Sequence, residues 1–140
     1  MIKSYELTKE GTAGTDIFDL TDDVQELLSR SAVQSGSVLV FVPGSTAAVT
    51  TIEFEGGVLE DLKRAIERLA PSGERYAHDA AWGDGNGYAH VRSALLGPSC
   101  VVPVTEGRLA LGTWQQVILL DFDNRPRRRR VIVQVCGEKQ

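Results

Sequence analysis

The sequence is dominated by short apolar segments of strand length, separated by turn residues. From Ser37 onwards these segments are SVLVFV, SCVVPV, RLALG, WQQVILLDF and RRVIVQV. Apolar and β-branched runs of this length, bounded by Gly, Pro, Asp or Asn, are typical of strands. Turn residues at Glu106–Gly107 and at Asp123–Pro126 join neighbouring segments. The second half of the chain is therefore predicted to form an antiparallel meander.

The N-terminal residues predict a hairpin followed by a helix. Ile2–Thr8 and Asp16–Leu20 have strand patterns, and the glycines of the Gly11–Gly14 segment would let them pair. Thr21 then has the position of an N-cap, and the two aspartates after it favour the positive end of a helix. One face of this helix would be apolar, with Val24, Leu27, Leu28 and Ala32.

A second helix has the strongest periodicity in the chain. Val58–Leu69 places apolar side chains on one face and charged side chains on the other, after a strand predicted over Ala47–Phe54. The pattern as a whole predicts one α+β domain over residues 1–140. Its architecture would be a layered, mainly antiparallel sheet or sandwich with two amphipathic helices.

Composition narrows the classes of partner. A net charge of -4 argues against a general nucleic-acid binder. No apolar run reaches the roughly 20 residues needed to span a bilayer, and the first residues lack the apolar core of a signal peptide. We therefore expect a cytoplasmic protein without a nucleic-acid or membrane partner. Cys100 and Cys136 lie in apolar, strand-like segments without CxxC spacing, which predicts buried free thiols.

The two histidines of the chain, His78 and His90, bracket the stretch HDAAWGDGNGYAH. Two imidazoles and a carboxylate such as Asp84 would give a divalent metal, Zn or Mg, three protein ligands and one open position. The twelve-residue spacing matches no zinc-finger or HExxH template. The structural alternative is one buried, hydrogen-bonded histidine and one surface histidine on a glycine-rich loop.

The glycines between the histidines suggest an anion site. Alternating glycines in Gly83–Gly87 permit positive φ angles, so consecutive N–H groups can point into one concavity. We expect Gly85, Asn86 and Gly87 to bind a phosphate there, while Asp84 or Asn86 could also bind a metal or a substrate hydroxyl. The segment is neither GxGxxG nor a P-loop. A tight turn that needs glycine for its shape is the alternative.

Ser45 and Thr46 form a hydroxyl-rich turn after a buried strand, and Glu53 follows on the next strand. Hydroxyls at a strand end can bind phosphate, and a carboxylate nearby can act as a base or metal ligand. Alternatively, these are ordinary turn and strand residues.

Five arginines occupy six positions in Arg125–Arg130. In a strand, Arg127 and Arg129 point one way while Arg128 and Arg130 point the other. The run therefore cannot form one basic face, and salt bridges to nearby acids are expected.

Four motifs in this order, VFVPGSTAAVTTIE, HDAAWGDGNGYAHVRSALLGPS, GRLALGTWQQVILLDFD and RPRRRRVIVQVCGE, resemble the YjbQ family, also called UPF0047. The resemblance implies an α+β homotrimer with pockets near the subunit interfaces, and a secondary thiamine-phosphate synthase activity attributed to some members. The family's histidines correspond to His78 and His90, its strand carboxylate to Glu53, and its loop to Asp84 and Asn86. Many members have histidine in place of Tyr88, and others in place of Gly44.

The functional hypothesis is a trimeric enzyme acting on a small phosphorylated molecule, with thiamine-phosphate synthesis as the candidate reaction. His78, His90 and Glu53 would be catalytic, and a divalent metal at His78, His90 and Asp84 would neutralise phosphate charge. The alternative hypothesis is a non-catalytic trimer that binds a small anion or a metal.

Overall fold

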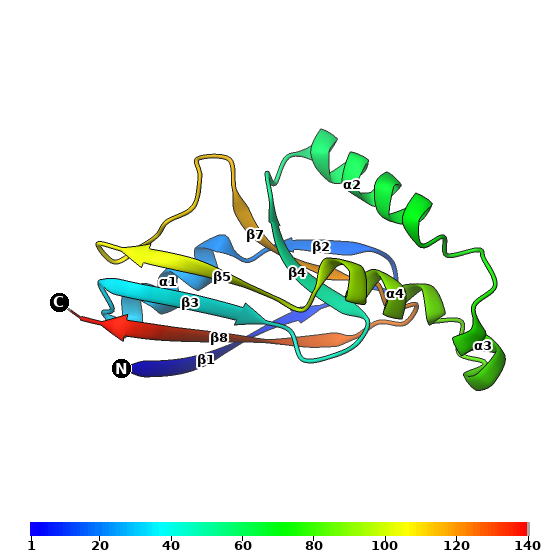
Figure 1. The fold of residues 1–140 in the computed structure, drawn as a ribbon, viewed down its shortest axis with the longest axis horizontal. Helices are drawn as coiled ribbons and strands as arrows, with labels where there is room; N and C mark the ends of the chain where they lie inside the picture. Colours follow the sequence, from blue (N-terminus) through cyan, green and yellow to red (C-terminus); the bar gives the residue numbers. More distant parts are fainter. Residues whose placement is uncertain (140) are drawn as a thin grey trace.

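The computed structural model describes residues 1–139 and has the expected α+β architecture (Figure 1). The strands of the described residues are β1 (Ile2–Glu10), β2 (Asp16–Asp19), β3 (Ser35–Phe41), β4 (Ala47–Ile52), β5 (Ser99–Thr105), β6 (Arg108–Leu109), β7 (Gln116–Asp121) and β8 (Arg128–Glu138). The helices are α1 (Thr21–Ser31), α2 (Gly56–Leu69), α3 (Ala77–Trp82) and α4 (Gly87–Leu96). The two predicted helices are confirmed. Helix α4 covers most of the HVRSALLG segment, where a short turn of helix was expected, and α3 was not predicted.

The strands form two antiparallel sheets. One has the order β1-β8-β3-β5-β6 and the other β2-β7-β4. The main core lies between the sheets and α1, whose apolar face is buried as predicted through Val24, Leu27 and Leu28. A second core cluster around Phe122 lies under α2 and α4 and includes Ile66 and Ala89. Strand β7 contributes to both clusters, because its side chains are buried on both faces of its sheet.

The predicted N-terminal hairpin is wrong. Strand β1 pairs with β8, whereas β2 pairs with β7 in the other sheet. Between β1 and β2, the Gly11 N–H donates to the carbonyl of Arg127 at 2.7 Å, and Asp16 accepts from the Thr12 N–H at 2.7 Å. These bonds stabilise the connection between the two sheets. A glycine-containing turn between two strands therefore does not by itself make the strands neighbours in one sheet.

The predicted C-terminal meander holds only for β5 and β6, which pair with each other. Strand β7 leaves that sheet and lies between β2 and β4, and β8 returns to lie between β1 and β3. The reason is burial: β7 is buried along nearly its whole length, and β8 has buried valines at alternate positions, so both strands need neighbours on either side.

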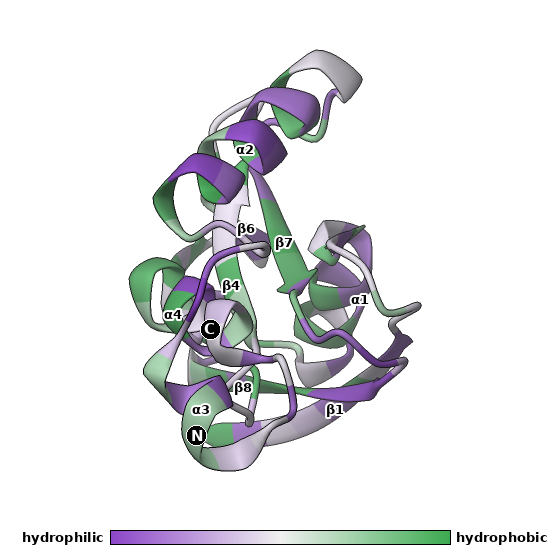
Figure 2. Ribbon diagram, turned by 90° about the vertical axis from the view of Figure 1, so that its right-hand side faces the viewer, coloured by the Kyte–Doolittle hydropathy of each residue, from purple (hydrophilic) through white to green (hydrophobic). Residues whose placement is uncertain are grey.

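The two long helices begin differently from the sequence prediction. Leu20, not Thr21, is the N-cap of α1, and the Thr21 hydroxyl accepts a hydrogen bond from the Val117 N–H at 2.9 Å. Helix α2 begins two residues earlier than predicted, at Gly56, because the Glu55 carboxylate accepts from two N–H groups of its first turn. Figure 2 shows α2 projecting away from the sheets, with hydrophilic and hydrophobic residues alternating along it.

One face of the five-stranded sheet points away from α1 and from the second sheet. Its centre is apolar, with Leu39, Phe41 and Ile132 half-buried and Val101 63% exposed. Cys136 lies on the same face and is exposed, so the expectation of two buried thiols is wrong for this residue, although both cysteines are free. Among the described residues, no helix is long and apolar enough to cross a membrane.

Candidate functional site

His78, Asp84 and His90 converge at one point. Helix α3 carries His78, the first turn of α4 carries His90, and the loop between the helices carries Asp84. The His78 Nε2 atom lies 3.1 Å from Asp84 Oδ2, and the two imidazole centroids are 4.4 Å apart. All three side chains are half-buried. The alternative of one buried and one surface histidine therefore does not describe this structure.

The loop that carries Asp84 is fixed by hydrogen bonds to the turn between β7 and β8. The Asn124 side chain donates to the carbonyl of Asp84 at 2.8 Å, and the Asn124 N–H donates to the side-chain oxygen of Asn86 at 3.1 Å. Asn86 is 4% exposed. Its amide oxygen therefore helps to hold the loop in place.

The glycines of this loop are needed for its shape. Gly83 and Gly85 have φ angles of 68° and 69°, in the left-handed region that favours glycine. A Cβ atom on Gly87 would lie 2.5 Å from the Tyr76 Cβ. The N–H groups of Asn86 and Gly87 already donate to Asp84 and Asp79. The predicted phosphate nest thus has two of its donors occupied by the protein itself.

The Asp84 carboxylate is prepared to act as an anionic ligand. A hydrogen bond from the Asn86 N–H, and a second from His78, lower the pKa of Asp84 below its usual value. Asp84 is therefore ionised at neutral pH, with one oxygen bonded to the loop and the other facing His78.

A pocket of about 400 Å³ opens beside this cluster. Its lining residues come from the β3–β4 turn, the α3–α4 loop, α4, the β7–β8 turn and the start of β8: Gly44, Ser45, Thr46, Asp84, Asn86, His90, Asp123, Arg127, Arg128 and Arg129. The structure thus brings the predicted Ser45 and Thr46 together with the predicted His90 and Asp84.

Glu53 and Tyr88 lie outside this pocket. Glu53 follows the last residue of β4, whereas Thr46 precedes its first residue, so the strand separates Glu53 from the cluster. Tyr88 packs against the second core cluster, and the Arg92 guanidinium lies 4.8 Å from the centre of its ring. Tyr88 is therefore partly buried against this core cluster and is not among the residues that converge at His78, Asp84 and His90.

Arginines line the pocket, which the sequence analysis did not anticipate. The expected salt bridges are present: Arg127 and Arg129 pair with Asp123 and Asp121, and on the other face Arg128 and Arg130 pair with Glu10 and Glu6. The alternation of strand side chains was the available signal. It separates Arg127 and Arg129 from Arg128 and Arg130, but it does not indicate that three of these arginines, including Arg128, line a pocket.

Thr46 joins the pocket wall to the arginines. Its hydroxyl donates to Asp123 Oδ2 at 2.9 Å and accepts from Arg129 Nη2 at 2.7 Å. Burial raises the pKa of Asp123, but hydrogen bonds from Thr46 and from its other donors outweigh it, so the pKa lies below its usual value. Two atoms of this network, Arg129 Nε and Asp121 Oδ2, are buried without a hydrogen-bond partner among residues 1–139.

The cluster fits a divalent metal of the zinc type. The potential ligand atoms of His78, Asp84 and His90 lie within 4.8 Å of one another. Tetrahedral ligation with bonds of about 2.1 Å would set such atoms roughly 3.4 Å apart, so only a small closure of side chains is needed. Two imidazoles and one carboxylate suit zinc better than magnesium, which prefers oxygen ligands.

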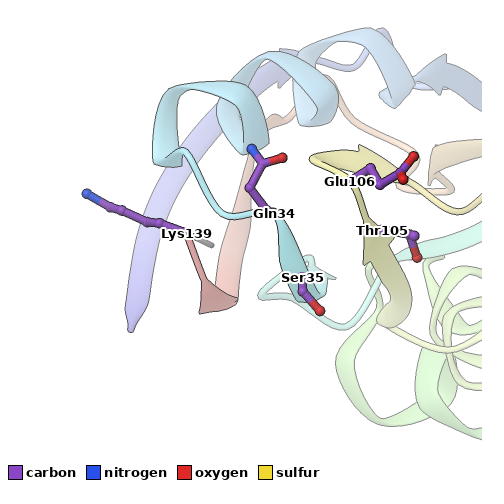
Figure 3. Close-up of a pocket in the computed structure, with 5 residues that line it drawn as sticks. All are labelled: Gln34, Ser35, Thr105, Glu106 and Lys139. Carbon is purple, nitrogen blue, oxygen red and sulfur yellow. The ribbon is translucent and has the colours of Figure 1, made fainter.

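A second hollow, of about 510 Å³, lies at the opposite end of β3. It is lined by Gln34, Ser35, Thr105, Glu106 and Lys139, and Figure 3 shows the Glu106 and Lys139 side chains pointing in different directions. Its charged groups do not converge on a common point, unlike those of the histidine pocket.

The fold and the pocket define a class of α+β proteins built from two antiparallel sheets, with a His/Asp cluster at the start of a short helix. Within that class, the chain belongs to the family described as UPF0047 protein YjbQ-like, whose model matches residues 5–138.

Relatives match the chain over nearly its whole length. A UPF0047 protein of Archaeoglobus fulgidus is 45% identical over 128 residues, which are 91% of this chain and 97% of the relative. A UPF0047 protein of Methanothermobacter thermautotrophicus is 34% identical, over 98% of this chain and 94% of the relative.

Solved structures of similar proteins share the fold. A YbjQ-like protein of unknown function from Sulfolobus solfataricus P2 has a TM-score of 0.88 and 31% identity, with 99% of this chain and all of that chain covered. A hypothetical protein from Aeropyrum pernix K1 has a TM-score of 0.90 and 34% identity, with coverage of 97% and 99%. The family and the α+β fold predicted from the sequence are confirmed.

Proposed function

We propose that this protein is an enzyme that acts on a small phosphorylated molecule in the pocket beside His90. One observation carries the proposal: the possible metal ligands Asp84 and His90 also line a polar pocket with Arg127, Arg128 and Arg129. Arginine is well suited to phosphate recognition, and imidazole is a common ligand for zinc.

Each residue of the site has a separate role in this proposal. His78, Asp84 and His90 hold a divalent cation, zinc before magnesium, which when bound supplies positive charge and Lewis acidity near a phosphate oxygen. Ser45 is exposed at the pocket and offers a hydroxyl to the phosphate. Glu53 lies outside the pocket of a single chain. Proton transfer is therefore assigned to the ring nitrogen of His78 or His90 that does not face the cation.

The candidate reaction is the synthesis of thiamine phosphate, which the family resemblance suggests. It joins a pyrimidine pyrophosphate to a thiazole phosphate and releases pyrophosphate as an anion. Both substrates carry phosphate groups, and stabilising the departing charge is a task for a cation and arginines in a confined pocket. The pocket volume of about 400 Å³ is within the range of small-molecule sites.

The proposed setting is a cytoplasmic homotrimer without nucleic-acid or membrane partners. Supporting the assembly is the uncovered apolar face of the five-stranded sheet, where Val101 is 63% exposed and Phe41 and Ile132 are half-buried. Sedimentation equilibrium tests it: we expect the mass of three chains, and Val101→Lys should shift the protein towards monomer. A wild-type monomer would contradict the assembly.

The test of the enzymatic function compares wild type, His90→Ala and Asp84→Asn for metal content and for formation of thiamine phosphate. Asp61→Asn is the matched control, because Asp61 is an exposed acid on α2, outside the pocket. We expect about one bound metal per chain in wild type and in the control, and loss of metal and turnover in the two site variants. A metal-free wild type without turnover would refute the proposal.

The second candidate function is a non-catalytic trimer that binds a small anion or a metal. The packing of Tyr88 into the core favours it, because the site then has two imidazoles and no third one at that position. In the same experiment, this candidate predicts stoichiometric metal or phosphate binding by wild type with no turnover of any phosphorylated substrate.

A further inference from the structure

The arginines of the histidine pocket are already neutralised by the protein. Arg127 Nε lies 3.0 Å from Asp123 Oδ2, and Arg129 Nη2 lies 2.7 Å from Asp121 Oδ1. Arg128 has an exposed partner, Glu10, at 3.6 Å. The pocket therefore offers a phosphate several guanidinium donors but little net positive charge.

The formal charges around the pocket show this balance. Arg127, Arg128 and Arg129 contribute three positive charges. Against them stand four carboxylates: Asp84 and Asp123 in the lining, Asp121 paired with Arg129, and Glu10 paired with Arg128. Asp123 and Asp121 are each 2% exposed at the side chain, so solvent screens these charges only weakly. Apart from the imidazoles, the sum is minus one before any ligand binds.

A phosphate dianion entering such a pocket meets two opposing effects. It gains hydrogen bonds from guanidinium and hydroxyl groups, but it also lies close to buried carboxylates that cannot move away. A divalent cation at His78, Asp84 and His90 would change the local sum from minus one to plus one. The anion would then bind a positive pocket, and the cation would in turn be held more tightly once the anion is present.

Among the three arginines of the pocket, Arg129 has a buried donor that no described residue accepts. Its side chain is 8% exposed, its Nε atom is buried without a partner among the described residues, and its Nη1 lies 3.3 Å from the point where a Cβ on Gly44 would stand. A buried donor without a partner is unusual in a native protein and indicates that something else completes its hydrogen bonds.

We propose that the pocket is a cation-dependent anion site, in which Asp121 and Asp123 keep the affinity for phosphate low until a cation binds at His78, Asp84 and His90. The proposal rests on the proposed function and adds an order to it: the cation binds first, and the phosphate group second. The carboxylates prevent the metal-free protein from binding phosphate esters unproductively.

The test is isothermal titration of inorganic phosphate into the full chain, with and without one equivalent of Zn²⁺, and the reciprocal titration of Zn²⁺ with and without phosphate. We expect each ligand to tighten the other by the same factor, within the roughly 5- to 150-fold range of coupled sites. Coupling below twofold with both ligands bound would overturn this inference alone. Failure of both ligands to bind would overturn the proposed function as well.

A variant tests the role of the buried carboxylate. Asp123→Asn removes the partner of Arg127, so phosphate should bind the zinc-free variant at least about fivefold more tightly than zinc-free wild type, and the coupling should shrink. Glu6→Gln is the matched control, because Glu6 pairs with Arg130 of the same arginine run but outside the pocket, at 3.5 Å. If the Asp123→Asn variant folds and binds phosphate as wild type does without zinc, the inference is contradicted. If the variant does not fold, the wild-type titrations alone test the inference.

Discussion

Replacing Arg129 by methionine should cost more stability than any other arginine substitution in the run Arg125–Arg130. Arg129 is 7% exposed, and its Nη2 donates to the carbonyl and the hydroxyl of Thr46 and to Asp121. Methionine keeps much of the side-chain volume but supplies neither charge nor donors. Asp121 would remain as a buried carboxylate without its ion-pair partner.

The expected cost follows from that uncompensated charge. Breaking a buried ion pair by removing one partner typically costs about 3 to 5 kcal/mol. The upper part of this range applies because Asp121 Oδ2 already has no hydrogen-bond partner among residues 1–139. The matched control is Arg130→Met, since Arg130 is 57% exposed and its pair with Glu6 should contribute about 1 kcal/mol or less.

Urea unfolding at a fixed protomer concentration measures both variants. With a slope of roughly 2 kcal/mol per M, a loss of 3 to 5 kcal/mol lowers the midpoint by about 1.5 to 2.5 M. Asp121→Asn combined with Arg129→Met should cost clearly less than the sum of the two single changes, because each removes the other's partner. A cost of Arg129→Met below about 1 kcal/mol, or strict additivity, would refute the reasoning.

Three further predictions follow from the packing and charges. Gly87→Ala should lower the free energy of unfolding by about 1 to 3 kcal/mol and weaken metal binding, because the new Cβ would lie 2.5 Å from the Tyr76 side chain. Its control in thermal unfolding is Gly73→Ala, which should be close to neutral because a Cβ there meets open space. Phe122→Ala should lower the free energy of unfolding by about 3 to 5 kcal/mol, since Phe122 is 1% exposed. Phe54→Ala, at 41% exposure, should lower it far less, and equal losses would contradict the packing of Phe122 in the second core cluster. The lowered pKa of Asp84 stabilises the fold above the usual aspartate range, and this contribution is lost as the pH falls through the lower folded value. Acid unfolding of Asp84→Asn should therefore show a shallower pH dependence than that of wild type below about pH 4.

Local patterns were sufficient where the interacting residues lie close together in the chain. The apolar face of α2 follows from 3.6-residue periodicity, and the His78–Asp84–His90 cluster forms within thirteen consecutive positions. A loop that short, with glycines at the turns, has few ways to separate its ends. The α+β class was predictable for the same reason, because it depends on which periods occur and not on how the strands pair.

Strand partners and long-range contacts were not predictable in this way. Alternation shows that β1 has two faces, but it does not show that Ile2 lies opposite Cys136. Glu53 lies outside the pocket of the single chain for a geometric reason: a six-residue strand is roughly 20 Å long, so residues close in sequence at its two ends are far apart in space. The pocket position of Arg127 depends on Asp123 and Thr46, which reach it only in the folded protein.

The position of β8 has a consequence for how the protein is made. This strand is the last of the described residues to leave the ribosome, yet it lies between β1 and β3 and hydrogen-bonds to both. Until residues 128–138 emerge, β1 has no neighbour and the valine-rich face of β3 lacks one side of its sheet. Until then, the nascent chain has uncovered apolar strand edges, which favour chaperone binding and aggregation. The larger sheet is then completed in a single late step of folding.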